Sequence, residues 1–182
     1  MKTHLWMTLL LGVVVSVVAP ARARAQAQWP NPYGPAIGVE TARKVAATAI
    51  AEGKKNGWTV AVAIVDPAGD LVYFERIDNT QVASIHVSQE KARTAVQFKR
   101  TTKAFEEALV GGRQALLSLP GVVPIEGGIP LLADGKIIGA IGVSGATSQQ
   151  DGVCAQAAAD TLGKAPAAAA APAPPAKPPV KK

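Results

Sequence analysis

Short apolar runs joined by tight turns constrain the fold of this 182-residue chain more than any other feature. The turn sequence at residues 67–70 separates two runs rich in Val and Ile, and Asp134-Gly135 is typical of a two-residue hairpin turn. Hairpins join antiparallel neighbours, so the sequence predicts an antiparallel sheet. The predicted strands are 58–66, 71–76, 122–125, 129–133 and 136–144.

Helical periodicity alternates with these runs. Ser84 and Asp151 are predicted to cap two helices, and Gly111-Gly112 ends a third before a short turn at 113–119. Helices packed on an antiparallel sheet define an α+β domain. The predicted helices are 39–55, 84–98, 102–110 and 151–162.

The two ends of the chain differ in composition from the middle. Residues 1–27 combine a positive start, an apolar run and small residues, which predicts a signal peptide and a periplasmic or secreted protein. The alternative is a membrane anchor, but the apolar run is shorter than the roughly 20 residues that a spanning helix needs. Residues 165–182 contain almost only Ala, Pro and Lys and predict a disordered tail, which leaves one domain at 28–164.

The charge of the domain argues against a nucleic-acid partner. Residues 28–163 hold twelve Lys and Arg against thirteen Asp and Glu, a net charge of −1, so the basic character belongs to the two ends. Cys154 is the only cysteine, which excludes an intramolecular disulfide and a structural zinc site.

The helix predicted at 84–98 has one mixed face. Val87, Lys91, Thr94 and Phe98 fall on this face at helical spacing, so an amine and a hydroxyl lie beside apolar groups. Such a face suits an amphipathic ligand or a subunit contact. The alternative is that Lys91 and Arg93 are solvated and that Thr94 bonds its own backbone.

His86 is the only histidine left once the leader is removed. An imidazole can bind haem iron or act as a general base, and Glu90 at i+4 can orient it. The alternative is an ordinary surface histidine.

Glycine-rich segments at Gly127-Gly128 and at 139–145 do not have the spacing of a dinucleotide fingerprint. Gly139 and Gly142 indicate close packing or a bulge within a strand. Gly127 and Gly128 can bring backbone amides to a carboxylate, or they can simply form a turn.

No set of catalytic residues is recognisable. The sequence contains no nucleophile elbow, no phosphate loop and no histidine pair at metal spacing, and its carboxylates occur singly. Ser144 has no obvious base. The sequence therefore favours a binding protein over an enzyme and predicts no catalytic residue.

The chain resembles the GlcG/HbpS-type haem-binding protein family, which is related to the C-terminal domain of PduO-type proteins. The resemblance spans residues 39–162, nearly the whole domain. The segments that carry it are 61–66 (AVAIVD) with Gly69 and Leu71, 83–85 (ASI), 91–95 (KARTA) with Phe98 and Thr101, 120–121 (PG), 126–130 (EGGIP), and 139–146 (GAIGVSGA) with Asp151.

This resemblance implies a profilin-like sheet of about five strands flanked by helices, assembled into a homo-oligomer. It also implies haem as the ligand, with a cobalamin-type corrinoid as the less favoured choice, and an extracytoplasmic partner protein that reads the ligand-bound state. The adenosyltransferase chemistry of PduO proteins belongs to a different domain.

Carried onto this sequence, the resemblance implies a haem site. Lys91 or Arg93 would pair with the propionates, Phe98 and Val87 would lie against the macrocycle, and Gly127 and Gly128 would supply a loop. His86 is the first choice for the iron ligand and Thr94 the weaker one. The expected roles are haem sensing, storage or scavenging; the alternatives are a glycolate-related or haem-degrading enzyme and a non-catalytic oligomeric interaction module.

Overall fold

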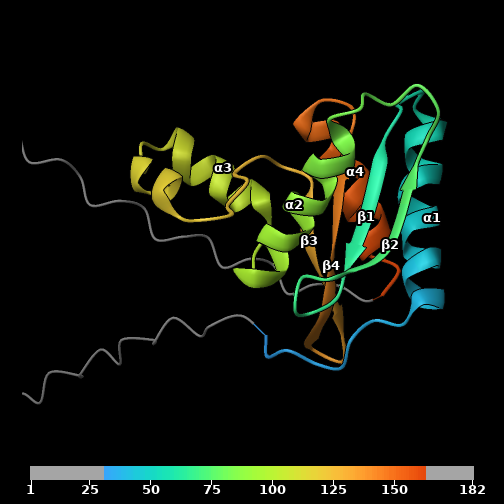
Figure 1. The fold of residues 1–182 in the computed structure, drawn as a ribbon, viewed down its shortest axis with the longest axis horizontal. Coiled ribbons are helices and arrows are strands. Elements are labelled where there is room, and N and C mark those ends of the chain that lie inside the picture. The colour runs from blue at the N-terminus through green and yellow to red at the C-terminus, as the bar shows by residue number, and fades with distance from the viewer. Residues whose placement is uncertain (1–30, 163–182) are drawn as a thin grey trace, which may run out of the picture.

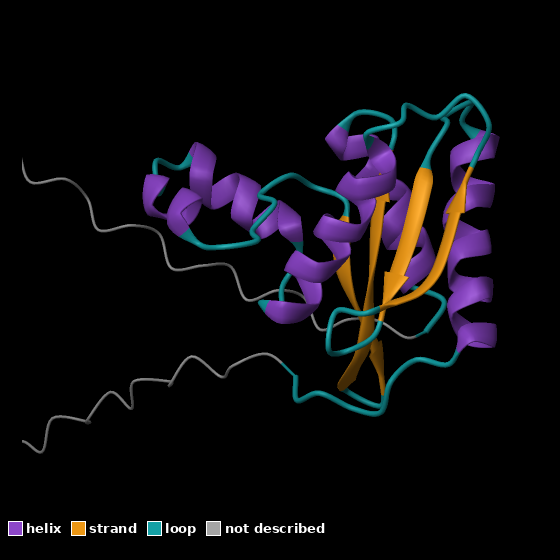
Figure 2. Ribbon diagram, in the orientation of Figure 1, coloured by secondary structure: helices purple, strands orange, loops and turns teal. Residues whose placement is uncertain are grey.

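The computed structural model describes residues 31–162, which form one sheet with helices on both faces (Figure 1, Figure 2). The predictions for residues 1–27 and 165–182 lie outside the described residues. In chain order the elements are α1 (Val39–Lys55), β1 (Ala61–Val65), β2 (Leu71–Arg76), α2 (Ser84–Gln97), α3 (Thr102–Val110), the 3-10 helix η1 (Gln114–Ser118), β3 (Gly128–Ala133), β4 (Lys136–Ser144) and α4 (Ser148–Ala159).

Within residues 31–162 the sheet has four antiparallel strands in the order β2-β1-β4-β3. The two predicted hairpins are confirmed as β1–β2 and β3–β4, and Asp134 and Gly135 both have positive φ in the second turn. The two hairpins meet between β1 and β4, where Ile64 lies opposite Ile141. The predicted α+β class with an antiparallel sheet is therefore confirmed.

The described part of the chain contributes one strand fewer to the sheet than the five expected. The strand predicted at 122–125 is wrong: these residues are irregular, because the Val123 amide donates to the Thr94 side chain on α2 and not to a neighbouring strand. A single parallel bridge between Tyr33 and Ile137 extends the sheet beyond the end of β1.

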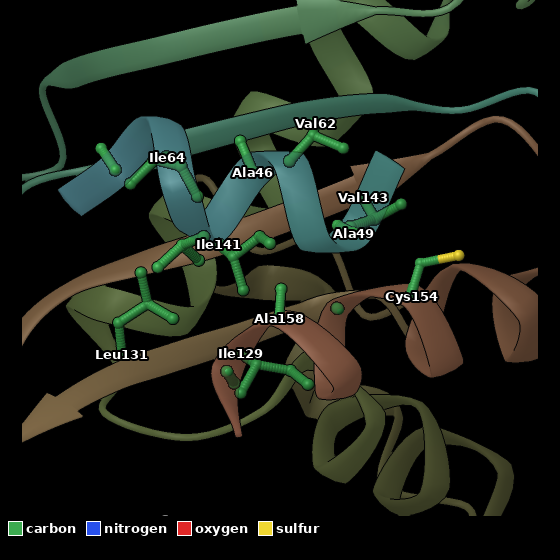
Figure 3. Close-up of a cluster of buried hydrophobic side chains, with 14 of the residues drawn as sticks. Ala46, Ala49, Val62, Ile64, Ile129, Leu131, Ile141, Val143, Cys154 and Ala158 are labelled. Carbon is green, nitrogen blue, oxygen red and sulfur yellow. The ribbon is translucent and has the colours of Figure 1, made fainter. Parts of the chain in front are cut away.

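The larger hydrophobic core lies between the sheet and the helix pair α1 and α4 (Figure 3). Val62, Ile64 and Ile141 point from the sheet toward this pair. Ala46 and Ala158 line the helices at the same place, and their small size lets α1 and α4 lie close to each other and to the strands.

On the other face α2 packs across β1, β4 and β3. Gly142 allows this close approach, because a Cβ there would overlap the Ser88 carbonyl oxygen and the Ala92 amide of α2. The close packing that the sequence predicted for Gly142 is therefore confirmed.

Both predicted helix caps are wrong. Thr147 caps α4 in a reciprocal capping box with Gln150, and Ala83 precedes the first residue of α2. The side chains of Ser84 and Asp151 are buried instead, and the Ser144 hydroxyl donates to the Ser84 hydroxyl across the contact between β4 and α2. These two side chains therefore bond residues distant in the sequence and do not cap the helices as predicted.

The chain segment that follows α2 and precedes β3 forms an arm that extends from the body of the domain (Figure 1). It consists of α3, η1 and the connection to Glu126, and it contacts the body mainly near its base. At that base the Phe98 and Phe105 rings meet edge to face, with their centroids 5.4 Å apart.

Candidate functional site

The structure separates the predicted site residues into three places. His86 and Arg93 lie on the outer side of α2, and Phe98 lies at the base of the arm. Lys91, Thr94, Gly127 and Gly128 are buried. The mixed helical face that the sequence predicted is therefore covered by protein at its centre.

The outer side of α2 carries a polar stripe of residues spaced three or four apart. His86 is exposed at the first turn of the helix, and Arg93 lies two turns later with its side chain 33 % exposed. The Arg93 guanidinium donates from Nη1 to Glu90, at 2.5 Å, and from Nε to the carbonyl oxygen of Gly69, at 3.2 Å. This second bond ties α2 to the β1–β2 turn.

Lys91 lies at the centre of a buried ion pair. Its side-chain nitrogen Nζ donates to Asp151 Oδ2 at 2.8 Å and to the Val143 carbonyl oxygen at 3.0 Å. The other carboxylate oxygen of Asp151 accepts from the Ala146 amide. Burial raises the pKa of the Asp151 carboxyl, although the Lys91 ammonium opposes this shift. The pair joins α2, β4 and α4, and Lys91 is only 1 % exposed.

Thr94 connects α2 to the arm. Its hydroxyl donates to the Gly121 carbonyl oxygen at 3.1 Å and accepts from the Val123 amide at 3.0 Å. The hydroxyl thus bonds a segment far away in the sequence and not its own helix. These two bonds hold residues 121–123, where the chain returns from the arm to the body, against α2.

Gly127 and Gly128 lie against the inner side of α2. A Cβ at Gly127 would come within 2.9 Å of Lys91 Nζ, and one at Gly128 would overlap the Lys91 carbonyl oxygen. The Gly128 amide donates to the Thr102 hydroxyl at 2.8 Å. These glycines make room for the ion pair and its helix.

A cavity of about 230 Å³ lies outside Gly127 and Gly128, between the base of the arm and α4. Sites for drug-sized ligands usually measure roughly 300–1,000 Å³. This cavity is therefore too small to enclose a porphyrin. Its lining comprises Thr101, Lys103, Glu126, Gly127, Gly128, Ile129, Gly152, Val153 and Gln156.

Across residues 31–162, no three His, Cys, Asp or Glu side chains gather as a metal centre would require. None of the helices in the same region is both long and apolar enough to cross a bilayer.

Sequence reasoning missed Asp151 as the partner of Lys91. One signal was present: Ser84, Ser88, Lys91 and Ala95 recur at spacings of four, three and four, so Lys91 continues a stripe of small residues. Such a stripe indicates a helix that packs closely, and a lysine within it needs a buried partner. The sequence spacing does not identify Asp151, 60 residues away, as that partner.

The fold and these residues define an α+β domain of the HbpS-like family: the model of this family, described as "Haem degrading protein HbpS-like", matches residues 37–160, and the chain belongs to it. Among its relatives is Protein GlcG of Escherichia coli strain K12, which is 44 % identical over 93 residues, or 51 % of this chain and 69 % of GlcG.

Solved structures show the same architecture. The crystal structure of HbpS is 32 % identical with a TM-score of 0.67, and the match covers 72 % of this chain and 93 % of HbpS. The crystal structure of a PduOC:Heme complex is 27 % identical with a TM-score of 0.63, and it covers 70 % of this chain and 96 % of PduOC.

Proposed function

We propose that this protein binds haem on the outer side of α2. The observation that carries the proposal is family membership over residues 37–160 together with the similarity to PduOC, which was crystallised with haem. The geometry favours an open surface site, because the cavity near Gly127 is too small for a porphyrin.

His86 and Arg93 are the residues proposed to contact the haem. They are seven positions apart, which places them on the same side of α2 and about 10.5 Å apart along its axis. The exposed imidazole is a donor that haem iron accepts. Within the described residues Arg93 Nη2 donates no hydrogen bond, so this nitrogen can donate to a propionate without breaking the contact with Glu90.

The buried residues of the predicted site have a supporting role in this proposal. Lys91 and Thr94 use their polar groups on Asp151, Val143, Gly121 and Val123. They hold α2 in a fixed position against the sheet and the arm. A rigid helix keeps His86 and Arg93 at constant separation.

The proposal includes a location, partners and a role. The leader predicted at residues 1–27 would place the protein in the periplasm or outside the cell, where it would sense, store or scavenge haem. Copies of the chain would associate, and another extracytoplasmic protein would read the bound state. Cell fractionation with the natural leader tests the location; retention of the full-length chain in the cytoplasm would contradict it.

Titration of the purified protein with haemin tests the binding. We expect a saturable shift of the Soret band in the wild type. In His86→Ala we expect a Soret band at a different wavelength and a lower affinity for haemin. The matched control is Gln81→Ala, which removes another exposed polar side chain near the start of α2. A wild type without a saturable shift would overturn haem binding, and an unchanged spectrum in His86→Ala would overturn the iron ligand. Parallel titration with cobalamin tests the corrinoid alternative.

The family description favours haem degradation as the second candidate. Under this alternative, haem bound to the protein would lose its Soret band in hydrogen peroxide faster than free haem does. Equal rates would favour binding without degradation.

A further inference from the structure

The cavity between the base of the arm and α4 takes no part in the proposed haem site. Neither His86 nor Arg93 lines it. Its volume is about 230 Å³, and a molecule of liquid water occupies about 30 Å³. The cavity therefore has room for a guest of about eight non-hydrogen atoms, which is the size of a small metabolite.

The wall of this cavity carries two opposite charges. Lys103 Nζ donates to Glu126 Oε1 at 3.1 Å. The Lys103 side chain is 54 % exposed and that of Glu126 is 15 % exposed, so the negative charge is the less solvated of the two. Within residues 31–162, Glu126 Oε2 accepts no hydrogen bond. This oxygen can accept from the ammonium group of a ligand, in a charge-assisted bond stronger than one between neutral groups.

Helices on two sides fix the Glu126 carboxylate. On α4, a Cβ at Gly152 would overlap the Glu126 side chain, so the carboxylate can lie here only beside a glycine. A glycine within a helix is less favourable than an alanine, and α4 therefore loses stability at the point where this carboxylate lies. On α3, the Glu106 carboxylate accepts from the Glu126 amide at 2.6 Å. A carboxylate that is already ordered loses little conformational entropy when it binds a ligand.

The rest of the wall combines apolar groups with a further acceptor. Ile129 and Val153 contribute the apolar part. The Gln156 Nε2 group donates to Asp160 at 2.8 Å, which leaves the Gln156 carbonyl oxygen as an acceptor. Pockets that bind small molecules usually have this composition, with apolar walls and a few polar groups that fix the orientation of the ligand.

We propose that this cavity binds a small zwitterion of the α-amino acid class. The ammonium group of the ligand donates to Glu126 Oε2, and its carboxylate accepts from Lys103 Nζ. A lysine ammonium has three donors, so Lys103 can bind the ligand and keep its bond to Glu126. A short aliphatic side chain lies against Ile129 and Val153. Valine has the number of atoms that the volume of the cavity indicates.

Charge argues against simpler occupants. A carboxylic acid without an amine would pair with Lys103 but bring a like charge close to Glu126. An amine without a carboxylate would pair with Glu126 and bring a like charge close to Lys103. A metal ion has too few ligands here, because no three His, Cys, Asp or Glu side chains gather anywhere in residues 31–162. A ligand that carries both charges complements both residues.

Titration of the ¹⁵N-labelled full chain with glycine, alanine and valine, followed by NMR, tests the proposal. We expect saturable chemical-shift changes at the amides of Gly127, Gly128 and Gly152, which line the cavity. 3-Methylbutanoate lacks the ammonium group of valine and 2-methylpropylamine lacks its carboxylate, so each should bind roughly 10-fold or more weakly than valine. No saturable change with any of the three amino acids would overturn the proposal. Binding of either analogue as tight as that of valine would overturn the zwitterion as the ligand.

Two variants test the charged residues separately. Glu126→Gln keeps the size of the side chain and should weaken valine binding by roughly 10–100-fold, the effect of losing a charge-assisted bond. Lys103→Met, at an exposed position where the fold should be kept, should weaken it by roughly 10-fold. The matched control is Glu107→Gln, which neutralises an exposed carboxylate of α3 outside the cavity and should leave the affinity unchanged. Unchanged affinity in either variant, with circular dichroism showing an intact fold, would overturn the proposed contacts. These results do not depend on haem, because His86 and Arg93 remain in every variant.

Discussion

Lys91 Nζ lies 2.8 Å from Asp151 Oδ2, and both side chains are almost completely buried between α2, β4 and α4. Ions are costly to remove from water, so each charge depends on the other and on the surrounding hydrogen bonds. The pair therefore determines how α2 is positioned against the rest of the domain.

Lys91→Met should lower the free energy of unfolding by about 3–5 kcal/mol, because it leaves the Asp151 carboxylate buried without its cation. Adding Asp151→Asn removes that charge while keeping an acceptor for the Ala146 amide, so the double variant should regain part of the loss. Urea denaturation measures the free energy of unfolding of the single and the double variant. A double variant less stable than Lys91→Met would contradict this account of the pair.

Gly142→Ala should destabilise the domain by several kcal/mol or prevent folding. The added Cβ would meet backbone atoms of Ser88 and Ala92, which cannot move without shifting α2. Gly38→Ala is the control, because open space surrounds a Cβ there; it should cost about 1 kcal/mol or less. Thermal unfolding compares the two, and similar melting temperatures would contradict the predicted contact.

Thr94→Val should cost roughly 1–3 kcal/mol, since it leaves the Val123 amide without its acceptor. Hydrogen exchange should show faster opening at Val123 and in the adjoining part of the arm. Thr48→Val removes a hydroxyl bond within α1 and serves as the control. Equal exchange at Val123 in the wild type and in Thr94→Val would show that this hydroxyl does not hold the arm.

Cys154 should react very slowly with thiol reagents in the folded protein. Burial raises the pKa of its thiol to about 11 from an ordinary value of 9.0, so near pH 8 only about one thiol in a thousand is ionised. The thiol of the unfolded chain ionises first as the pH rises from 9 to 11, so this group lowers stability across that range. Labelling with a disulfide reagent at pH 8, with and without urea, compares the reaction rate of this thiol in the folded and unfolded protein. Rapid labelling of the native protein would contradict it.

Arg93→Ala should weaken haem binding by roughly 10–100-fold if the guanidinium contacts a propionate, as expected for a charge-assisted hydrogen bond. Arg43→Ala is a close control, because Arg43 forms the same i,i+3 pair with Glu40 on the surface of α1. Haemin titration of both variants provides the comparison. Equal affinities would remove Arg93 from the proposed site.

Local patterns were sufficient for most of the fold. Apolar runs joined by turns at residues 67–70 and at Asp134-Gly135 predicted the two hairpins, and helical periodicity located α1, α2 and α3. Residues 122–125 were the exception: their apolar character predicted a strand, but Thr94 satisfies the Val123 amide. Thr94 lies 29 positions from Val123, so the residues around Val123 do not indicate this bond.

The site depended more on tertiary structure. Sequence spacing placed Lys91, Thr94 and Phe98 on one helical face but did not show what covers that face. Only the folded chain brings Asp151 to Lys91 and Gly121 to Thr94. Periodicity is a property of neighbours in the chain, and it therefore determined the helices and strands. Burial and ion pairing depend on groups that meet only when distant segments pack together. The tertiary structure therefore decided which polar side chains face solvent.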